Sequence, residues 1–228
     1  MKILRDWTEK EGDRRLFLWL YYCFPRERGH RASPQWHVFP GFFAHTIGER
    51  FKQYANMGAR GMYFNGFAQG VDAYVTLRML HDASQTVDAI LDDYFSRYYG
   101  AAAEPMKALY LMIEDIYCSP ENYEPNDRGR VGHQTKRMAI TKLYTAEHMD
   151  AMEALIKQAG ARAETKKEKK RVQLFKLSTW SYMQAAVYKT TEYERQDRWK
   201  GHAASLHEIC GRAPKLKDNA LRGKTFVY

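Results

Sequence analysis

The residues with the most suggestive chemistry are aromatic and amide side chains at the ends of two short apolar runs. Trp19, Tyr21 and Tyr22 belong to the first run, and Asn65 lies in the second. A flat ring can lie against the apolar C–H face of a sugar, while a tyrosine hydroxyl or an asparagine amide can hydrogen-bond to sugar hydroxyls. These four residues are candidates for one wall of a saccharide-binding subsite. Packing within a core or at strand ends is the alternative.

Alternation along a strand limits how many of these rings can act together. Successive side chains point to opposite faces, so Tyr21 shares a face with Trp19 and Tyr22 takes the other. Tyr21 and Tyr22 can therefore line one cavity only if the strand ends between them.

Other catalytic or metal-binding patterns are missing from the sequence. Cys23, Cys118 and Cys210 are far apart and form no CxxC pair. The eight histidines contain no HxxxH pair, and no GxSxG nucleophile motif occurs. We therefore expect neither a metal site nor a cofactor.

The net charge of +9 is unevenly distributed. Residues 1–145 carry 19 basic and 17 acidic residues, whereas residues 146–228 carry 17 and 10. No aromatic residues alternate with the lysines at 166–170, as base stacking would require. The sequence favours a solvated helix start and a basic tail, and a nucleic-acid binder ranks last. No apolar stretch approaches the ~20 residues of a membrane span, and no signal peptide is visible, so we expect no membrane partner.

Two short apolar runs frame a helical pattern. Residues 15–23 and 59–67 have the length and composition of buried strands, and residues 42–56 between them have apolar positions at helical spacing. A strand, a helix and a second strand form a βαβ unit, whose strands should be parallel and buried on both faces. Gly58 should end the helix.

The rest of the chain reads as helical. Patterns of helix spacing and capping predict helices near residues 71–80, 87–98, 106–116, 146–160 and 164–195, with Thr145 as an N-cap. Residues 121–137 are polar and contain two glycines and a proline, so we interpret residues 121–144 as a linker or excursion. Residues 212–228 have the composition of a basic tail.

Two parallel strands are too few for a stable sheet, because both edges would be open. Further strands must come from a longer protein or from a second copy. Self-association through the open edges is therefore a possible property of this chain.

Several segments resemble one bacterial family. They are residues 18–22 (LWLYY), 39–41 (FPG), 54–63 (YANMGARGMY), 93–102 (DYFSRYYGAA) and 170–175 (KRVQLF). In order and spacing they resemble the family called domain of unknown function 4838, which is similar to α-glucuronidases and β-hexosaminidases. The resemblance runs from about Leu16 to Tyr188.

The resemblance implies a fold class and a domain plan. The chain would be α/β giving way to mostly α: the last β/α units of a TIM-type barrel, followed by a C-terminal helical extension. Residues 1–120 would be the barrel part, 121–144 a linker, 145–211 the extension and 212–228 the tail. A whole barrel needs about 250 residues and eight strands, and two strands are legible here.

The same resemblance implies a hydrolase that acts on, or binds, polysaccharide-derived sugars, often in exported bacterial proteins. Glycoside hydrolysis ordinarily needs two carboxyl groups facing each other. Glu27 and Asp72 are the acids nearest the strand ends, and loop solvation or a helix first turn explains them more simply. The catalytic residues therefore stay unknown, and this chain alone is expected to be inactive. One hypothesis is a fragment that completes a saccharide-binding cleft. The other is a non-catalytic helical interaction module.

Overall fold

The computed structural model describes residues 2–11, 16–20, 38–65, 70–123 and 134–187. These residues are mostly helical. The chain divides into two compact units: residues 1–24 with 41–94, and residues 25–40 with 95–228. The boundary between them falls inside helix α4 (Val87–Tyr99).

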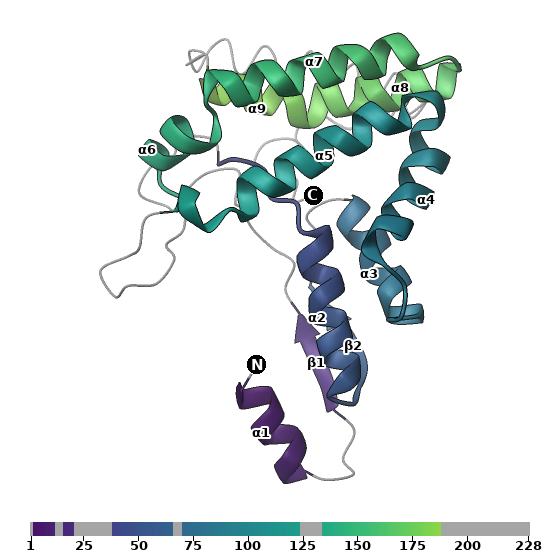
Figure 1. The fold of residues 1–228 in the computed structure, drawn as a ribbon, viewed down its shortest axis with the longest axis vertical. Coiled ribbons are helices and arrows are strands. Elements are labelled where there is room, and N and C mark those ends of the chain that lie inside the picture. Colours follow the sequence, from purple (N-terminus) through teal and green to yellow (C-terminus); the bar gives the residue numbers. More distant parts are fainter. Residues whose placement is uncertain (1, 12–15, 21–37, 66–69, 124–133, 188–228) are drawn as a thin grey trace, which may run out of the picture. The chain divides into compact units, whose positions relative to one another are not determined.

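The first unit contains the two strands. Along the chain it comprises α1 (Lys2–Glu11), β1 (Leu16–Leu20), α2 (Ala44–Asn56), β2 (Ala59–Phe64), α3 (Gly70–His81) and the start of α4 (Figure 1). β1 and β2 pair in parallel, with Leu18 opposite Met62 and Trp19 opposite Tyr63. The parallel pairing predicted from the sequence is confirmed. Tyr21, Tyr22 and Cys23, which the predicted first strand included, lie outside the described residues.

Helix α2 covers one face of this sheet. Leu18 is buried, and the ring of Phe64 stacks on that of Phe51 in α2, with centroids 6.3 Å apart and planes 11° apart. Gly58 ends the helix as expected, because its φ of 76° is a conformation that glycine adopts without a Cβ clash. The predicted helix and its stop are therefore confirmed.

The other face of the sheet is not buried, so the prediction of strands buried on both faces was wrong. Phe17 is 66% exposed, and Trp19 and Tyr63 are each 63% exposed. A continuous apolar run does not reveal whether a second layer covers the sheet. Here one face of the strand pair is buried under α2, and the other face carries exposed aromatic side chains.

Polar contacts link the helices of the first unit. Asp72, in the first turn of α3, is buried, and its carboxylate accepts a hydrogen bond from the Phe43 backbone N–H at 3.2 Å. Phe43 is the N-cap residue of α2, so Asp72 caps one helix from the next. Between α3 and α4, Arg78 pairs with Asp93 at 3.0 Å.

The second unit is mostly helical in its described residues. It contains α5 (Ala103–Cys118), α6 (Lys136–Met138), α7 (Ala146–Arg162), α8 (Lys166–Phe175) and α9 (Ser181–Val187). Short 3₁₀ turns span Gly100–Ala102 and Pro120–Asn122, and π-helical segments span Ala139–Leu143 and Lys176–Trp180. Within this unit α7 packs on α5 and on α8, which Figure 1 shows as neighbouring rods.

Side-chain caps set the helix starts in this unit, and one of them, Thr145, was predicted from the sequence. Thr145 accepts the His148 N–H at 3.2 Å, which confirms it as the N-cap of α7. Thr165 and Glu168 form a capping box at the start of α8. The predicted linker, residues 121–144, includes the helical residues 136–143, where Met138 and Leu143 are buried. Residues beyond 187, including the predicted basic tail, lie outside the described part.

Val38 and Phe39, which belong to no helix or strand, are buried within this second unit. The side-chain amide of Gln134 accepts from the Phe39 N–H at 2.7 Å and donates to its carbonyl at 3.0 Å, as a neighbouring strand would. The hydroxyls of Tyr144 and Tyr182 donate to the Val38 carbonyl oxygen. All of these partners lie more than 90 residues away in the sequence.

Candidate functional site

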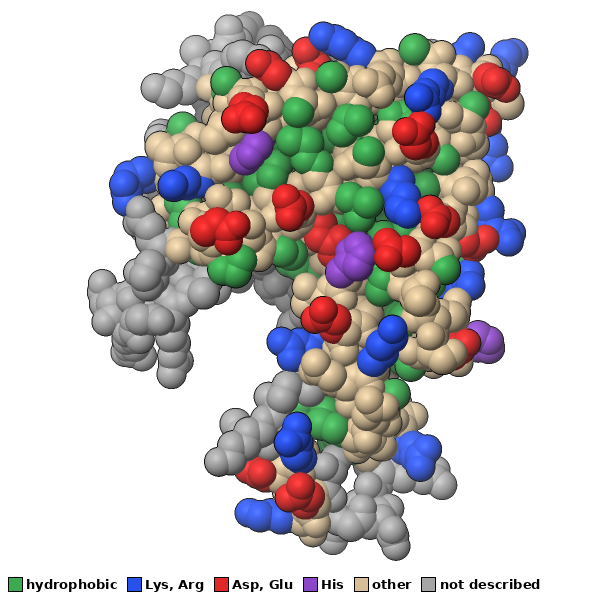
Figure 2. Space-filling model, in the orientation of Figure 1, with side chains coloured by type: hydrophobic (Ala, Val, Ile, Leu, Met, Phe, Trp, Pro, Cys, Tyr) green, Lys and Arg blue, Asp and Glu red, His purple; other side chains and the backbone are tan. Residues whose placement is uncertain are grey.

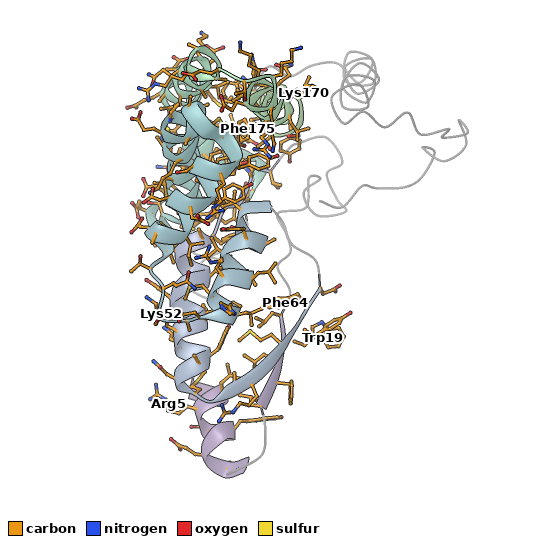
Figure 3. All side chains as sticks on the ribbon, turned by 90° about the vertical axis from the view of Figure 1, so that its right-hand side faces the viewer. Arg5, Trp19, Lys52, Phe64, Lys170 and Phe175 are labelled. Atoms are coloured by element: carbon orange, nitrogen blue, oxygen red, sulfur yellow. The ribbon has the colours of Figure 1, made fainter. Side chains whose placement is uncertain are left out.

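The exposed face of the β1–β2 sheet carries the residues that could hold a ligand. The register places Trp19 opposite Tyr63 and Phe17 opposite Gly61 on this face. Figure 3 shows Trp19 projecting away from α2, whereas Phe64 lies on the α2 side of the sheet. We call Phe17, Trp19, Tyr63 and Asn65 the aromatic face.

The rings of Trp19 and Tyr63 meet edge to face. Their centroids are 5.5 Å apart and their planes make an angle of 83°. This T-shaped arrangement is a preferred geometry of aromatic pairs, because the positive edge of one ring meets the negative face of the other. The pair therefore forms a corner of two nearly perpendicular rings, and both rings remain largely exposed.

Phe17 lies across the neighbouring strand at Gly61. A β-carbon on Gly61 would be 2.6 Å from Cε1 and 2.7 Å from Cδ1 of Phe17, which is closer than real contacts allow. The glycine thus leaves the space in which the Phe17 ring rests against β2. The outer side of the ring stays open to solvent.

Asn65 extends the aromatic face with an amide. Its backbone N–H donates to the Leu20 carbonyl at 2.9 Å, so the pairing of the strands continues one residue past β2. Because side chains alternate, Asn65 falls on the same face as Tyr63, and it is exposed. The amide and the Tyr63 hydroxyl supply hydrogen-bonding groups beside the rings.

The sequence identified half of this face. Trp19 and Asn65 were predicted and lie on it, while Tyr21 and Tyr22 lie outside the described residues. Phe17 and Tyr63 were not singled out. Both residues could have been predicted. Alternation along the first run puts Phe17 on the same face as Trp19, and the parallel pairing of the two runs puts Tyr63 beside it.

The carboxylates offer little for catalysis in the described part of the chain. Asp72 lies in the first turn of α3, as predicted; it is buried, and its carboxylate accepts the Phe43 N–H. Glu27 lies outside the described residues. The aromatic face itself has no acidic member among the residues that the structure describes.

Other kinds of site find no support within the described ranges. There, no cluster of three or more histidine, cysteine, aspartate or glutamate side chains is placed to bind a metal ion. None of the described helices combines the length and the apolar character needed to span a bilayer. On the face drawn in Figure 2, acidic and basic side chains are interspersed over the helices of the second unit.

The first unit contains a parallel strand pair that α2 covers on one face and that carries exposed aromatic rings on the other. Residues 7–112 match the sequence model of the family described as "Domain of unknown function (DUF4838)". This match covers the whole aromatic face and supports the resemblance to that family over residues 7–112. No curated protein and no solved structure matches the chain.

Proposed function

We propose that this chain contributes a saccharide-binding surface, the aromatic face, to a cleft of a glycoside-hydrolase-like domain of the barrel type. The observation that carries the proposal is the exposed Trp19–Tyr63 corner on one face of a parallel strand pair. Sheets of parallel strands are normally covered on both faces. Solvent-exposed rings at such a position are costly unless they bind something.

The size of the face favours a small ligand over a protein partner. An aromatic side chain buries about 150–250 Å² when covered, so three rings exposed to nearly two thirds present roughly 300–500 Å². A stable protein interface covers about 800 Å² on each partner. A sugar ring fits this area better, since its C–H face packs on an aromatic ring while its hydroxyls reach the amide of Asn65 and the hydroxyl of Tyr63.

The proposal assigns binding and leaves the chemical step unassigned. A hydrolase needs two opposed carboxyl groups, and Asp72 is committed to capping α2. The aromatic face would therefore position a saccharide, and no described residue of this chain is given a catalytic role.

Titration of the purified 228-residue chain with soluble oligosaccharides tests the proposal. Cello-, xylo-, manno- and chito-tetraose would be added to protein labelled with ¹⁵N, and the tryptophan indole signals followed by NMR. We expect the Trp19 signal to shift with at least one probe. Trp19→Ala should weaken binding by about tenfold or more, the usual effect of truncating a central aromatic contact.

Trp7→Ala is the matched control. Trp7 lies in α1 and is 57% exposed, so it resembles Trp19 in type and exposure but is not on the aromatic face. Its loss should leave affinity unchanged. If both variants bind as the wild type does, or if no saccharide shifts the Trp19 signal, the non-catalytic helical module becomes the better interpretation.

A further inference from the structure

We infer that the second unit positions the saccharide site of the first, because its side chains hold Val38 and Phe39 near the end of the connection from β1 to α2. Gln134, Tyr144 and Tyr182 are then positioning residues, which act on the site through the backbone and touch no ligand. The inference rests on the proposed function, because the site concerned is the aromatic face.

Side chains of the second unit bind the backbone of Val38 and Phe39, which belong to no helix or strand. The side-chain oxygen of Gln134 accepts the Phe39 N–H at 2.7 Å, and its amide nitrogen donates to the Phe39 carbonyl oxygen at 3.0 Å. A planar amide that binds both polar groups of one residue fixes the orientation of that residue as well as its position. The hydroxyls of Tyr144 and Tyr182 donate to the Val38 carbonyl oxygen. The buried Phe39 ring also meets that of Tyr144, with centroids 5.0 Å apart.

The same stretch of chain is bound again where it enters the first unit. The boundary between the units falls between Pro40 and Gly41, and residues 40–42 are buried. The Phe43 N–H then donates to the carboxylate of Asp72 at 3.2 Å. Because Asp72 lies in the first turn of α3, the helix that follows β2, this bond joins the ends of the connections that follow the two strands.

Connections of this kind shape ligand sites in α/β folds. In sheets of parallel strands, ligands bind beyond the carboxyl ends of the strands, where the following connections begin. Trp19 is next to the last residue of β1, and Tyr63 and Asn65 flank the last residue of β2. The aromatic face therefore extends to the edge of the sheet at which both connections begin.

A connection that is fixed before binding loses less conformational entropy when a ligand orders it. Fixing the backbone of one residue corresponds to roughly a five- to thirtyfold change in an equilibrium constant. Loss of the bonds to Phe39 should thus weaken saccharide binding by about three- to tenfold, although no contact with the ligand is lost.

Gln134→Glu gives a test that pH can reverse. The side chain keeps its shape, but an ionised carboxylate cannot donate to the Phe39 carbonyl and repels its oxygen, whereas a protonated carboxyl group can donate again. The whole chain would be titrated, with NMR detection, with the oligosaccharide that shifts the wild-type Trp19 signal most. At about pH 7 the variant should bind about three- to tenfold more weakly than wild type. At about pH 4, near the ordinary pKa of a glutamate, the two affinities should approach each other.

Loss of stability alone would not give this pattern, since a chain that remains folded binds with unchanged affinity. Tyr117 and Tyr123 also interact with the side chain of Gln134, and burial raises the pKa of both, so they stay neutral across this range. Gln173→Glu is the matched control, because Gln173 is an exposed residue of α8 and the substitution adds the same charge. It should bind as wild type does at both pH values.

Backbone hydrogen exchange reports the positioning without any ligand. In Gln134→Glu at about pH 7, the Phe43 amide should exchange at least about threefold faster than in wild type, relative to amides inside α2. If Gln134→Glu fails to fold, Tyr144→Phe combined with Tyr182→Phe removes both hydroxyls from the Val38 carbonyl. This double variant should weaken binding and speed Phe43 exchange in the same way.

Each outcome bears on a named claim. Wild-type affinity of Gln134→Glu at about pH 7, a weakening that persists at about pH 4, or unchanged Phe43 exchange would overturn the inference and leave the proposed function standing. Absence of any Trp19-dependent binding by the wild type would remove both.

Discussion

Tyr144 and Tyr182 donate their hydroxyl protons to one acceptor, the backbone carbonyl oxygen of Val38, at 2.8 and 2.9 Å. Both tyrosines follow π-helical segments, which end at Leu143 and Trp180. Because a π-turn contains one more residue than an α-turn, it changes which later side chains face a neighbouring element. Tyr144, just after one π-helical segment, and Tyr182 in α9 thus both bind the carbonyl of Val38, which is distant from each in the sequence.

Because the two hydroxyls share one acceptor, we predict that either one alone can satisfy the Val38 carbonyl. Tyr144→Phe or Tyr182→Phe alone removes one hydrogen bond and should cost about 1 kcal/mol, because the Val38 carbonyl keeps the other donor. The double variant leaves the carbonyl without either hydroxyl, and a buried acceptor that loses its partners costs about 1–3 kcal/mol more. Urea unfolding of the four proteins should therefore give a double-variant loss larger than the sum of the single losses.

The control for this cycle is Tyr54→Phe. The hydroxyl of Tyr54 makes no hydrogen bond with any described residue, although its ring packs on Phe51. This variant should unfold within about 0.5 kcal/mol of wild type. Strict additivity of Tyr144→Phe and Tyr182→Phe would show that the two hydroxyls do not depend on each other.

Tyr144 also predicts a loss of stability at high pH. Burial, and then the neighbouring Tyr182, raises the pKa of Tyr144 well above its ordinary value of 10.0. The folded state thus favours the protonated phenol. Its contribution to stability is complete below the unfolded pKa and is lost as the pH rises from there toward the folded pKa. When the pH rises from about 9 to about 11, the free energy of unfolding should therefore fall less for Tyr144→Phe than for wild type. Parallel pH profiles would contradict the assignment.

Glu168 predicts the opposite pH dependence. Backbone N–H groups of Thr165 and Glu164, which donate to its carboxylate at 3.1 and 2.8 Å, lower the pKa of Glu168 below 4.5. A lowered folded pKa stabilises the protein above the unfolded pKa, and that stability is lost as the pH falls through the folded pKa. Glu168→Gln should thus be less stable than wild type near pH 7, and this difference should shrink toward about pH 3.

Glu164→Gln tests whether the effect belongs to the cap. Glu164 gives its backbone N–H to the same capping box, and the substitution keeps that N–H. Its stability difference from wild type should therefore change little with pH. If Glu164→Gln and Glu168→Gln follow the same profile, general loss of surface charge explains the result.

Local signals made much of the fold predictable. Gly58 and Thr145 marked a helix end and a helix start through backbone conformation and a side-chain cap, which act within a few residues. The parallel pairing followed from the order of strand, helix and strand. These features depend on neighbours in the sequence, so the sequence reveals them.

Long-range features were not predictable in the same way. The two hydrogen bonds between Gln134 and Phe39 join residues 95 positions apart. Nothing in the sequence indicates them, because Gln134 is a polar residue in a polar stretch. The π-helical segments are so short that their apolar spacing does not differ from that of an ordinary α-helix, so the sequence does not reveal them. The exposure of Phe17 depends on whether another layer covers the sheet, and no pattern within a strand records that.

Gly61 and Phe17 allow a test of how the aromatic face is built. Gly61→Ala alone should destabilise the chain by about 1 kcal/mol, at the low end for overpacking because the exposed Phe17 ring can swing outward. With Phe17→Ala already present, the same change should stabilise by about 0.4–1 kcal/mol, since alanine restricts the unfolded chain more than glycine does. Gly160→Ala is the control, because no atom beyond its chain neighbours and its own helix backbone lies within 4 Å of the added β-carbon, and its effect should be equal in both backgrounds. A sign reversal at Gly61 alone would establish that the glycine is present to seat the ring, whereas equal effects at both glycines would mean that Phe17 is not held against β2.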